Sequence, residues 1–108
     1  MHERKTKMAE LSDGFIALPG GAGTLEEIFE QWTWSQLGIH QKPCAFLNIQ
    51  GFYDDLLKMI QGTVERGFTQ SRFVEKLIAS DQIDVILNAF EHYQPAAPKW
   101  GAQTQVHP

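Results

Sequence analysis

The residues whose types and spacing best suit chemistry form one short run, PGGAGTLEE, at positions 19–27. The run follows an apolar segment and precedes a helix pattern, so we expect it at a strand-to-helix turn. Glycine has no Cβ, so its backbone can adopt left-handed angles and turn several N–H groups toward one anion. We predict this geometry at the three glycines of the run: Gly20, Gly21 and Gly23.

A helix start and a hydroxyl add to this predicted anion site. The helix expected from about Leu25 contributes the positive end of its dipole, and Thr24 offers its hydroxyl to the same oxygen atoms. The run matches neither the dinucleotide fingerprint nor the Walker loop, because no lysine follows the last glycine. The alternative is that the glycines only form a tight turn.

Glu27 has two interpretations. The sequence from Thr24 to Glu27 matches a capping box, in which the glutamate turns back to a backbone N–H at the helix start. A carboxylate about one turn from a bound phosphate can also reach a ribose, and stabilise positive charge at its anomeric carbon or position a water. Arg4 and Lys5 are similarly either solvated helix charges or groups that a first helix brings near the ligand.

Strand-like and helical patterns alternate along the chain. Three short apolar segments predict buried strands, and apolar residues at helical spacing predict helices between and after them. Gly67 suits the end of the second long helix, with Phe68 packing back on its last turn, and Ser80 or Asp81 suits the cap of the last. The strands are Phe15–Leu18, Cys44–Ile49 and Leu77–Ala79; the stripes are Leu25, Ile28, Phe29 and Trp32, then Phe52, Leu56, Leu57, Ile60 and Val64, then Ile83, Ile86, Leu87 and Phe90. Weaker helical patterns cover residues 1–11 and 72–76.

This alternation predicts an α/β fold with a parallel sheet and flanking helices. Doubly wound nucleotide-binding sheets have about six strands, so we interpret the three found here as the C-terminal part of a Rossmann-like sheet, with the N-terminal half missing. The strand edge beside Phe15–Leu18 is then expected to be unpaired. We assign residues 1–93 to a partial nucleotide-binding domain, and residues 94–108, where periodicity is lost, to a loose C-terminal tail.

Composition limits the possible partners. The chain has 108 residues, 43% of them hydrophobic, and a net charge of -4, which argues against a broad basic surface for nucleic acid or anionic lipid. No apolar run is long enough to span a membrane, so we expect a cytoplasmic protein. Cys44 is the only cysteine, and its apolar neighbours favour a buried strand position over a reactive thiol. The four histidines show no ligand spacing with Cys44 or with one another, so no metal is predicted.

Two motifs together resemble a known family. The sequence MHERK at positions 1–5, followed by PGGAGTLEE, resembles the paired M-H-x-R-K and P-G-G-x-G-T-x-x-E motifs of the Lonely Guy (LOG) family. These proteins are cytokinin riboside 5'-monophosphate phosphoribohydrolases, long mislabelled as lysine decarboxylases. The segment WSQLGIH at 34–40 and Pro43 are also similar, and the resemblance extends to about Tyr93.

The resemblance implies hydrolysis of the N-glycosidic bond of a nucleoside 5'-monophosphate, giving free base and ribose 5-phosphate, without a cofactor. It implies Arg4 and Glu27 as the catalytic pair, with Arg4 placing positive charge near the sugar and leaving base, and Glu27 supporting an oxocarbenium-like transition state. The implied nucleotide-binding residues are Arg4, Lys5, Gly20, Gly21, Ala22, Gly23, Thr24 and Glu27.

The resemblance also implies a homodimer and an AMP-like substrate. Trp34 is the better interface candidate, because Trp32 lies on the predicted core stripe. Decarboxylation is disfavoured, because nothing in the sequence marks the Schiff-base lysine that a pyridoxal enzyme needs. Two alternatives remain: a nucleosidase with a broader preference for purine or pyrimidine monophosphates, and an inactive, truncated phosphate-binding remnant.

Overall fold

The structure is a computed structural model that describes Arg4, Lys7 and residues 10–99. Arg4, Lys7, Glu10 and Leu11 are helical and precede the first strand. The elements that follow are β1 (Phe15–Ala17), α2 (Ala22–Leu37), β2 (Cys44–Leu47), a 3-10 turn (Ile49–Gly51), α3 (Asp54–Glu65), α4 (Ser71–Glu75), β3 (Ile78–Ser80) and α5 (Ile83–Glu91).

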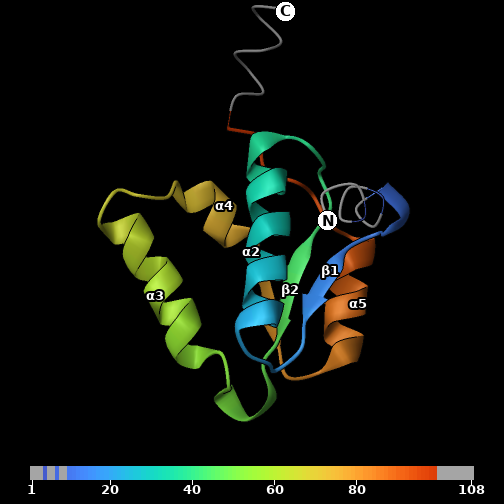
Figure 1. Ribbon diagram of the computed structural model, residues 1–108, viewed down its shortest axis with the longest axis vertical. Coiled ribbons are helices and arrows are strands. Elements are labelled where there is room, and N and C mark those ends of the chain that lie inside the picture. The colour runs from blue at the N-terminus through green and yellow to red at the C-terminus, as the bar shows by residue number, and fades with distance from the viewer. Residues whose placement is uncertain (1–3, 5–6, 8–9, 100–108) are drawn as a thin grey trace, which may run out of the picture.

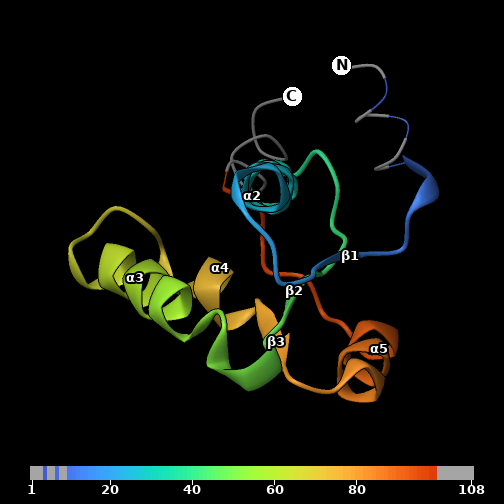
Figure 2. The ribbon, with the colours of Figure 1, turned by 60° about the horizontal axis from the view of Figure 1, so that its bottom comes forward.

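The three strands form one parallel sheet in the order β1-β2-β3, which confirms the α/β class. Phe15 is in register with Cys44, and Ala45 with Ile78. Helices α2, α3 and α4 lie on one face of the sheet and α5 on the other (Figure 2). The strands all point the same way, so the turns that enter α2, α3 and α5 lie at one end of the molecule (Figure 1). In the described part of the chain β1 is an edge strand.

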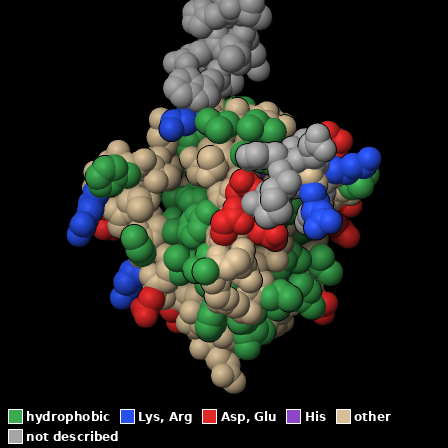
Figure 3. Space-filling model, in the orientation of Figure 1, with side chains coloured by type: hydrophobic (Ala, Val, Ile, Leu, Met, Phe, Trp, Pro, Cys, Tyr) green, Lys and Arg blue, Asp and Glu red, His purple; other side chains and the backbone are tan. Residues whose placement is uncertain are grey.

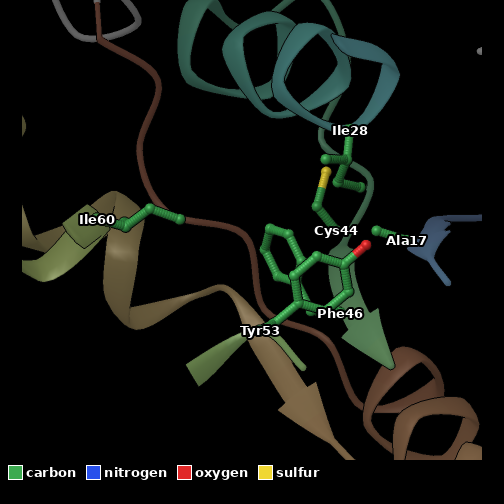
Figure 4. Close-up of a cluster of buried hydrophobic side chains, with 6 residues drawn as sticks. All are labelled: Ala17, Ile28, Cys44, Phe46, Tyr53 and Ile60. Carbon is green, nitrogen blue, oxygen red and sulfur yellow. The ribbon is translucent and has the colours of Figure 1, made fainter. Parts of the chain in front are cut away.

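The core lies between the sheet and the helices α2, α3 and α4. Its buried side chains come from all three of β1, α2 and β2 and from the α3 region (Figure 4). The predicted stripe of α2 is confirmed, since Ile28 is buried and its partners pack against the core. The buried cluster is Ala17, Ile28, Cys44, Phe46, Tyr53 and Ile60, with Leu25, Phe29, Trp32, Leu56 and Leu57 among the partly buried residues around it.

Two predicted core positions around α3 are wrong. Phe52 is 53% exposed, because it precedes the helix and its ring covers Tyr53 edge-on, 4.9 Å away between centroids. Gly67 does end the helix with a positive φ of 84°, as predicted. The Phe68 side chain is nevertheless 83% exposed, and only its backbone N–H returns, to the Thr63 carbonyl. This C-cap is therefore made by the backbone alone.

The predicted stripe of α5 is also too wide. Ile86 is fully buried, but Ile83 and Leu87 are 42% and 49% exposed. Helix α5 packs on β3 and β2, which covers Ile86 fully and leaves Phe90 partly buried. The cap position of α5 is Gln82, whose N–H donates to the Ser80 hydroxyl; the predicted Ser80 or Asp81 cap is one or two residues early.

The segment assigned to a loose tail makes defined contacts as far as Lys99. Arg72 donates from Nε to the carbonyl of Ala97 at 3.0 Å, and the Lys99 N–H donates to the carbonyl of Gln36 near the end of α2. None of the helices in the described part of the chain has the length and apolar character that a bilayer crossing requires.

Candidate functional site

The turn between β1 and α2 leaves the start of α2 open. Gly21 is the N-cap residue, and the first hydrogen bond of the helix runs from the Leu25 N–H to the Gly21 carbonyl at 3.1 Å. The N–H groups of the first turn therefore have no acceptor within the helix. Among the described residues no side chain caps this end, and no acidic residue lies in its first turn. An anion is the natural complement of such an end.

The capping-box interpretation of Glu27 is wrong. Because α2 begins at Ala22, before the predicted start near Leu25, Thr24 already lies within the first turn and Glu27 within the second. A side chain in the second turn is too far along the helix to bond the N-cap N–H. The Glu27 side chain is exposed and lines a groove instead.

The glycines act differently from the prediction. Among the described residues only Gly38, Gly51 and Gly67 are glycines with positive φ, so the predicted left-handed angles in the glycine run are wrong. A Cβ at Gly20 would collide with the Thr24 hydroxyl and lie 3.0 Å from the Thr24 Cβ, so this glycine permits a close approach. Gly21 and Gly23 face open space. Because neither position carries a side chain, the backbone there is open to approach.

A groove of about 390 Å³ runs from this turn along β1 and α2. Residues 14–18 form one wall, and one face of α2 forms the other, with side chains at the i, i+3, i+4 and i+7 spacing of a single helix face. The volume lies in the range of about 300–1,000 Å³ that is typical of small-molecule sites. The α2 residues that line it are Thr24, Glu27, Ile28 and Gln31.

Negative charge lies beyond the open helix end. Figure 3 shows acidic side chains gathered over α2, whose sequence carries Glu26, Glu27 and Glu30. Since the first turn is free of acid, these carboxylates begin one turn beyond the N–H groups.

The predicted site residues fall into three groups. Thr24 and Glu27 line the groove together, and residues 20–23 form the turn and helix start beside them. Arg4 is helical and exposed and is not among the residues that line the groove. Lys5 lies outside the described residues. The structure thus brings the turn and Glu27 together, and the pairing of Arg4 with Glu27 stays a prediction.

One supporting residue was missed by the sequence analysis. Tyr53 is buried, and its hydroxyl donates a 2.5 Å hydrogen bond to the carbonyl of Leu18, immediately before the glycine turn. The Tyr53 N–H in turn donates to Oδ1 of Asn48, and the Asn48 amide donates to Asp54. The turn after β2 therefore supports the turn after β1. No local pattern predicts this contact, because the two residues are distant in sequence.

Cys44 takes no part in the groove. It is buried in β2, as predicted, and burial raises the pKa of its thiol to about 12. The reactive thiolate is thus essentially absent at neutral pH. In the described part of the chain, no three His, Cys, Asp or Glu side chains come together as metal ligands would.

The fold and the site define an α/β protein in which a Rossmann-like strand, glycine turn and helix border a groove that runs along β1 and α2. The family described as "Possible lysine decarboxylase" matches residues 1–90. The chain belongs to this family, which is the one that the LOG motifs indicate.

Three curated relatives show how far the similarity extends. The chain is 47% identical over 95 residues to the cytokinin riboside 5'-monophosphate phosphoribohydrolase LOG4 of Arabidopsis thaliana, covering 88% of this chain and 44% of that protein. For LOG1 of the same plant the identity is 46% over 99 residues, or 92% and 46%. For LOG of Oryza sativa subsp. japonica it is 47% over 95 residues, or 88% and 39%. The chain therefore spans less than half the length of these relatives.

The family's description suggests pyridoxal chemistry, which the groove does not fit. A pyridoxal enzyme holds its cofactor through a Schiff-base lysine. No lysine is among the described residues that line the groove.

Proposed function

We propose that the chain hydrolyses the N-glycosidic bond of a nucleoside 5'-monophosphate, releasing the free base and ribose 5-phosphate. The observation that carries the proposal is the uncapped, acid-free start of α2, which opens into the groove lined by Glu27. The names of the relatives, all phosphoribohydrolases of cytokinin riboside 5'-monophosphates, support this substrate class. An AMP-like nucleotide is the simplest member of that class.

The site suggests how the substrate would lie. Its phosphate would accept hydrogen bonds from the N–H groups of Ala22, Gly23 and Thr24 and from the Thr24 hydroxyl. Glu27 is one turn further, about 4.5 Å along the helix axis by a rise of 1.5 Å per residue, and would face the ribose. In the same proposal Lys5 adds positive charge at the phosphate.

The reaction breaks the C–N bond between the ribose and the base. Positive charge develops at the anomeric carbon, where the Glu27 carboxylate would stabilise it and position the attacking water. The water's hydroxyl joins the anomeric carbon and its proton ends on the base nitrogen. Arg4 would offset the negative charge that develops on the leaving base. A homodimer, with Trp34 at its interface, and a cytoplasmic location complete the proposal.

The test follows base release from AMP and from isopentenyl-AMP by chromatography. We expect release by the unaltered chain and a fall in kcat of about two orders of magnitude in Glu27→Gln, the typical loss for one charge-stabilising group. Glu26→Gln is the matched control, because it makes the same change on the same helix outside the groove lining. Equal release by Glu27→Gln would exclude its catalytic role, and no release from either substrate would exclude the enzyme proposal for this chain.

The same assay separates two further candidates. Because the chain spans less than half of its relatives, a phosphate-binding module without activity is the main one. It would bind AMP, release no base, and lose binding when the α2 start is altered. A broader nucleosidase would release base from purine and pyrimidine monophosphates without preference for the isopentenyl group.

A further inference from the structure

Gln31 is the one buried polar side chain in the part of the chain that the structure describes, with only 7% of its surface exposed. It lies one turn beyond Glu27 on the same face of α2 and lines the same groove. Buried amides are normally fully hydrogen-bonded, because an unmet donor or acceptor away from water is costly. The hydrogen bonds that Gln31 makes therefore show which of its amide atoms remains available to a ligand.

His40 is hydrogen-bonded to the oxygen of the Gln31 side-chain amide. The Lys42 N–H donates to His40 Nδ1 at 3.1 Å, so that nitrogen is an acceptor. The ring proton is then on Nε2, which donates to Gln31 Oε1 at 3.2 Å. Burial and the charge of Lys42 lower the pKa of His40, which favours this neutral ring. The ring also rests against Phe15 of β1, 5.3 Å away between centroids.

This network fixes the direction of the amide. With Oε1 bonded to His40, the atom left for a ligand is Nε2, which carries two N–H donors. Nε2 has no hydrogen-bond partner among the described residues, and the Gln31 side chain lines the groove. The groove is therefore lined by an oriented donor that nothing in the described chain satisfies.

We propose that Gln31 recognises the base of the nucleotide, by donating an N–H to an acceptor atom of the base, and that His40 is its positioning residue. The proposal rests on the function proposed above, which places the phosphate at Thr24 and the ribose at Glu27. Gln31 follows on the same helix face, about 10.5 Å beyond Thr24 at 1.5 Å per residue. Phosphate, sugar and base would thus meet successive turns of α2.

The test compares the binding of AMP with that of ribose 5-phosphate, which lacks the base, by titration calorimetry. Gln31→Met keeps the length of the side chain and removes its donors. We expect its affinity for AMP to fall about fivefold, the usual effect of one neutral hydrogen bond, and its affinity for ribose 5-phosphate to stay unchanged. Gln61→Met, on the exposed surface of α3, is the control and should change neither affinity.

Two further variants separate recognition from a structural role. Gln31→Glu keeps an oxygen for His40 and loses the donors, so it should weaken AMP binding more than Gln31→Met does. His40→Phe keeps the ring beside Phe15 and frees the amide to turn over, so AMP affinity should fall about twofold, in proportion to the correctly oriented fraction.

The affinities for AMP and for ribose 5-phosphate, compared in each variant, decide between the possible outcomes. An equal loss for AMP and ribose 5-phosphate, or no loss for AMP in Gln31→Met and Gln31→Glu, would overturn the role of Gln31 while leaving the proposed function intact. If the unaltered chain binds neither ligand, the proposed function itself fails and the role of Gln31 fails with it. Thermal unfolding shows whether each of the three variants folds. If one does not, the other two decide.

Discussion

The starts of α2 and α3 follow neighbouring parallel strands at the same edge of the sheet, yet they are built in opposite ways. The first turn of α3 contains Asp54 and Asp55, and the space beside Gly51 is filled by the Asp54 carboxylate. The first turn of α2 contains no acid, and the space beside Gly21 and Gly23 is empty. The start of α3 therefore has acidic side chains of its own beside its N–H groups, whereas the first turn of α2 has none.

Helix α5 extends the comparison. It follows β3 at the same edge and carries Asp84 in its first turn. Of the three helices that follow a strand in the described chain, α2 alone lacks this acid. A glycine-rich turn is therefore only part of what distinguishes the site; the missing acid is the other part.

The most direct way to abolish the contrast is Ala22→Asp, which gives α2 the acidic first turn of α3. We expect ribose 5-phosphate to bind more than about tenfold more weakly, because the carboxylate takes the place of the anion. The free energy of unfolding should rise by about 0.3–1 kcal/mol, since the helix end gains its complement. Calorimetry and thermal unfolding measure the two effects. Gln61→Glu adds the same charge on α3 and should leave binding unchanged; a similar loss in both variants would contradict the site.

A pair of glycine variants tests the open space. Gly23 and Gly62 both lie in helices, and no atom beyond their own neighbours lies within 4 Å of the position that an alanine Cβ would take. Ala at either site should therefore stabilise the chain by about 0.5 kcal/mol. Only Gly23→Ala should weaken ribose 5-phosphate binding, several-fold, because its methyl group enters the anion site. Calorimetric affinities that are equal for Gly23→Ala and Gly62→Ala would show that the phosphate does not sit there.

The contact between the two turns is tested by Tyr53→Phe. Removal of the hydroxyl leaves the Leu18 carbonyl without this donor, so the free energy of unfolding should fall by about 1 kcal/mol. Chemical denaturation measures the change. An unaltered midpoint and slope would mean that water replaces the hydroxyl without loss, and that the turn after β2 does not support the glycine turn.

The smallest effect is expected from Asp55→Asn, which makes α3 more like α2. The loss of one charge at an exposed helix start should lower the free energy of unfolding by about 0.3 kcal/mol at low salt, and by less at high salt. Phosphate binding should not change. Thermal unfolding at two salt concentrations provides the measurement, and a salt-independent difference would point to a cause other than the helix dipole.

Much of the fold was predictable because its signals are local. Short apolar runs predicted the strands, the first two beside glycine or proline, and the spacing of Ile28 with its neighbours predicted the buried face of α2. The start of α2 was not predictable in the same way. Thr24 and Glu27 fit a capping box in sequence, and only the backbone at Gly21 shows that the helix has already begun. The exposure of Leu87 is likewise not predictable from the spacing of apolar residues in α5.

The candidate site likewise has one part that local sequence predicts and another that depends on the fold. The glycine turn and the place of Glu27 beside it follow from residues adjacent in sequence. The Tyr53 contact and the Gln31–His40 network depend on the fold, because each joins segments that only the packing of strands and helices brings together. Sequence reasoning found the part of the site that one turn contains and missed the parts that span several elements.

The N–H groups of the first turn of α2, which have no acceptor within the helix, also offer a way to detect a bound ligand. Amides without an acceptor exchange their hydrogen with deuterium much faster than amides held inside a helix. Those of Ala22, Gly23 and Thr24 should therefore exchange early in the free protein, although they belong to a helix whose centre is packed on the core. An anion held there would slow these three amides and few others, so the exchange pattern alone would mark where on the chain a ligand rests.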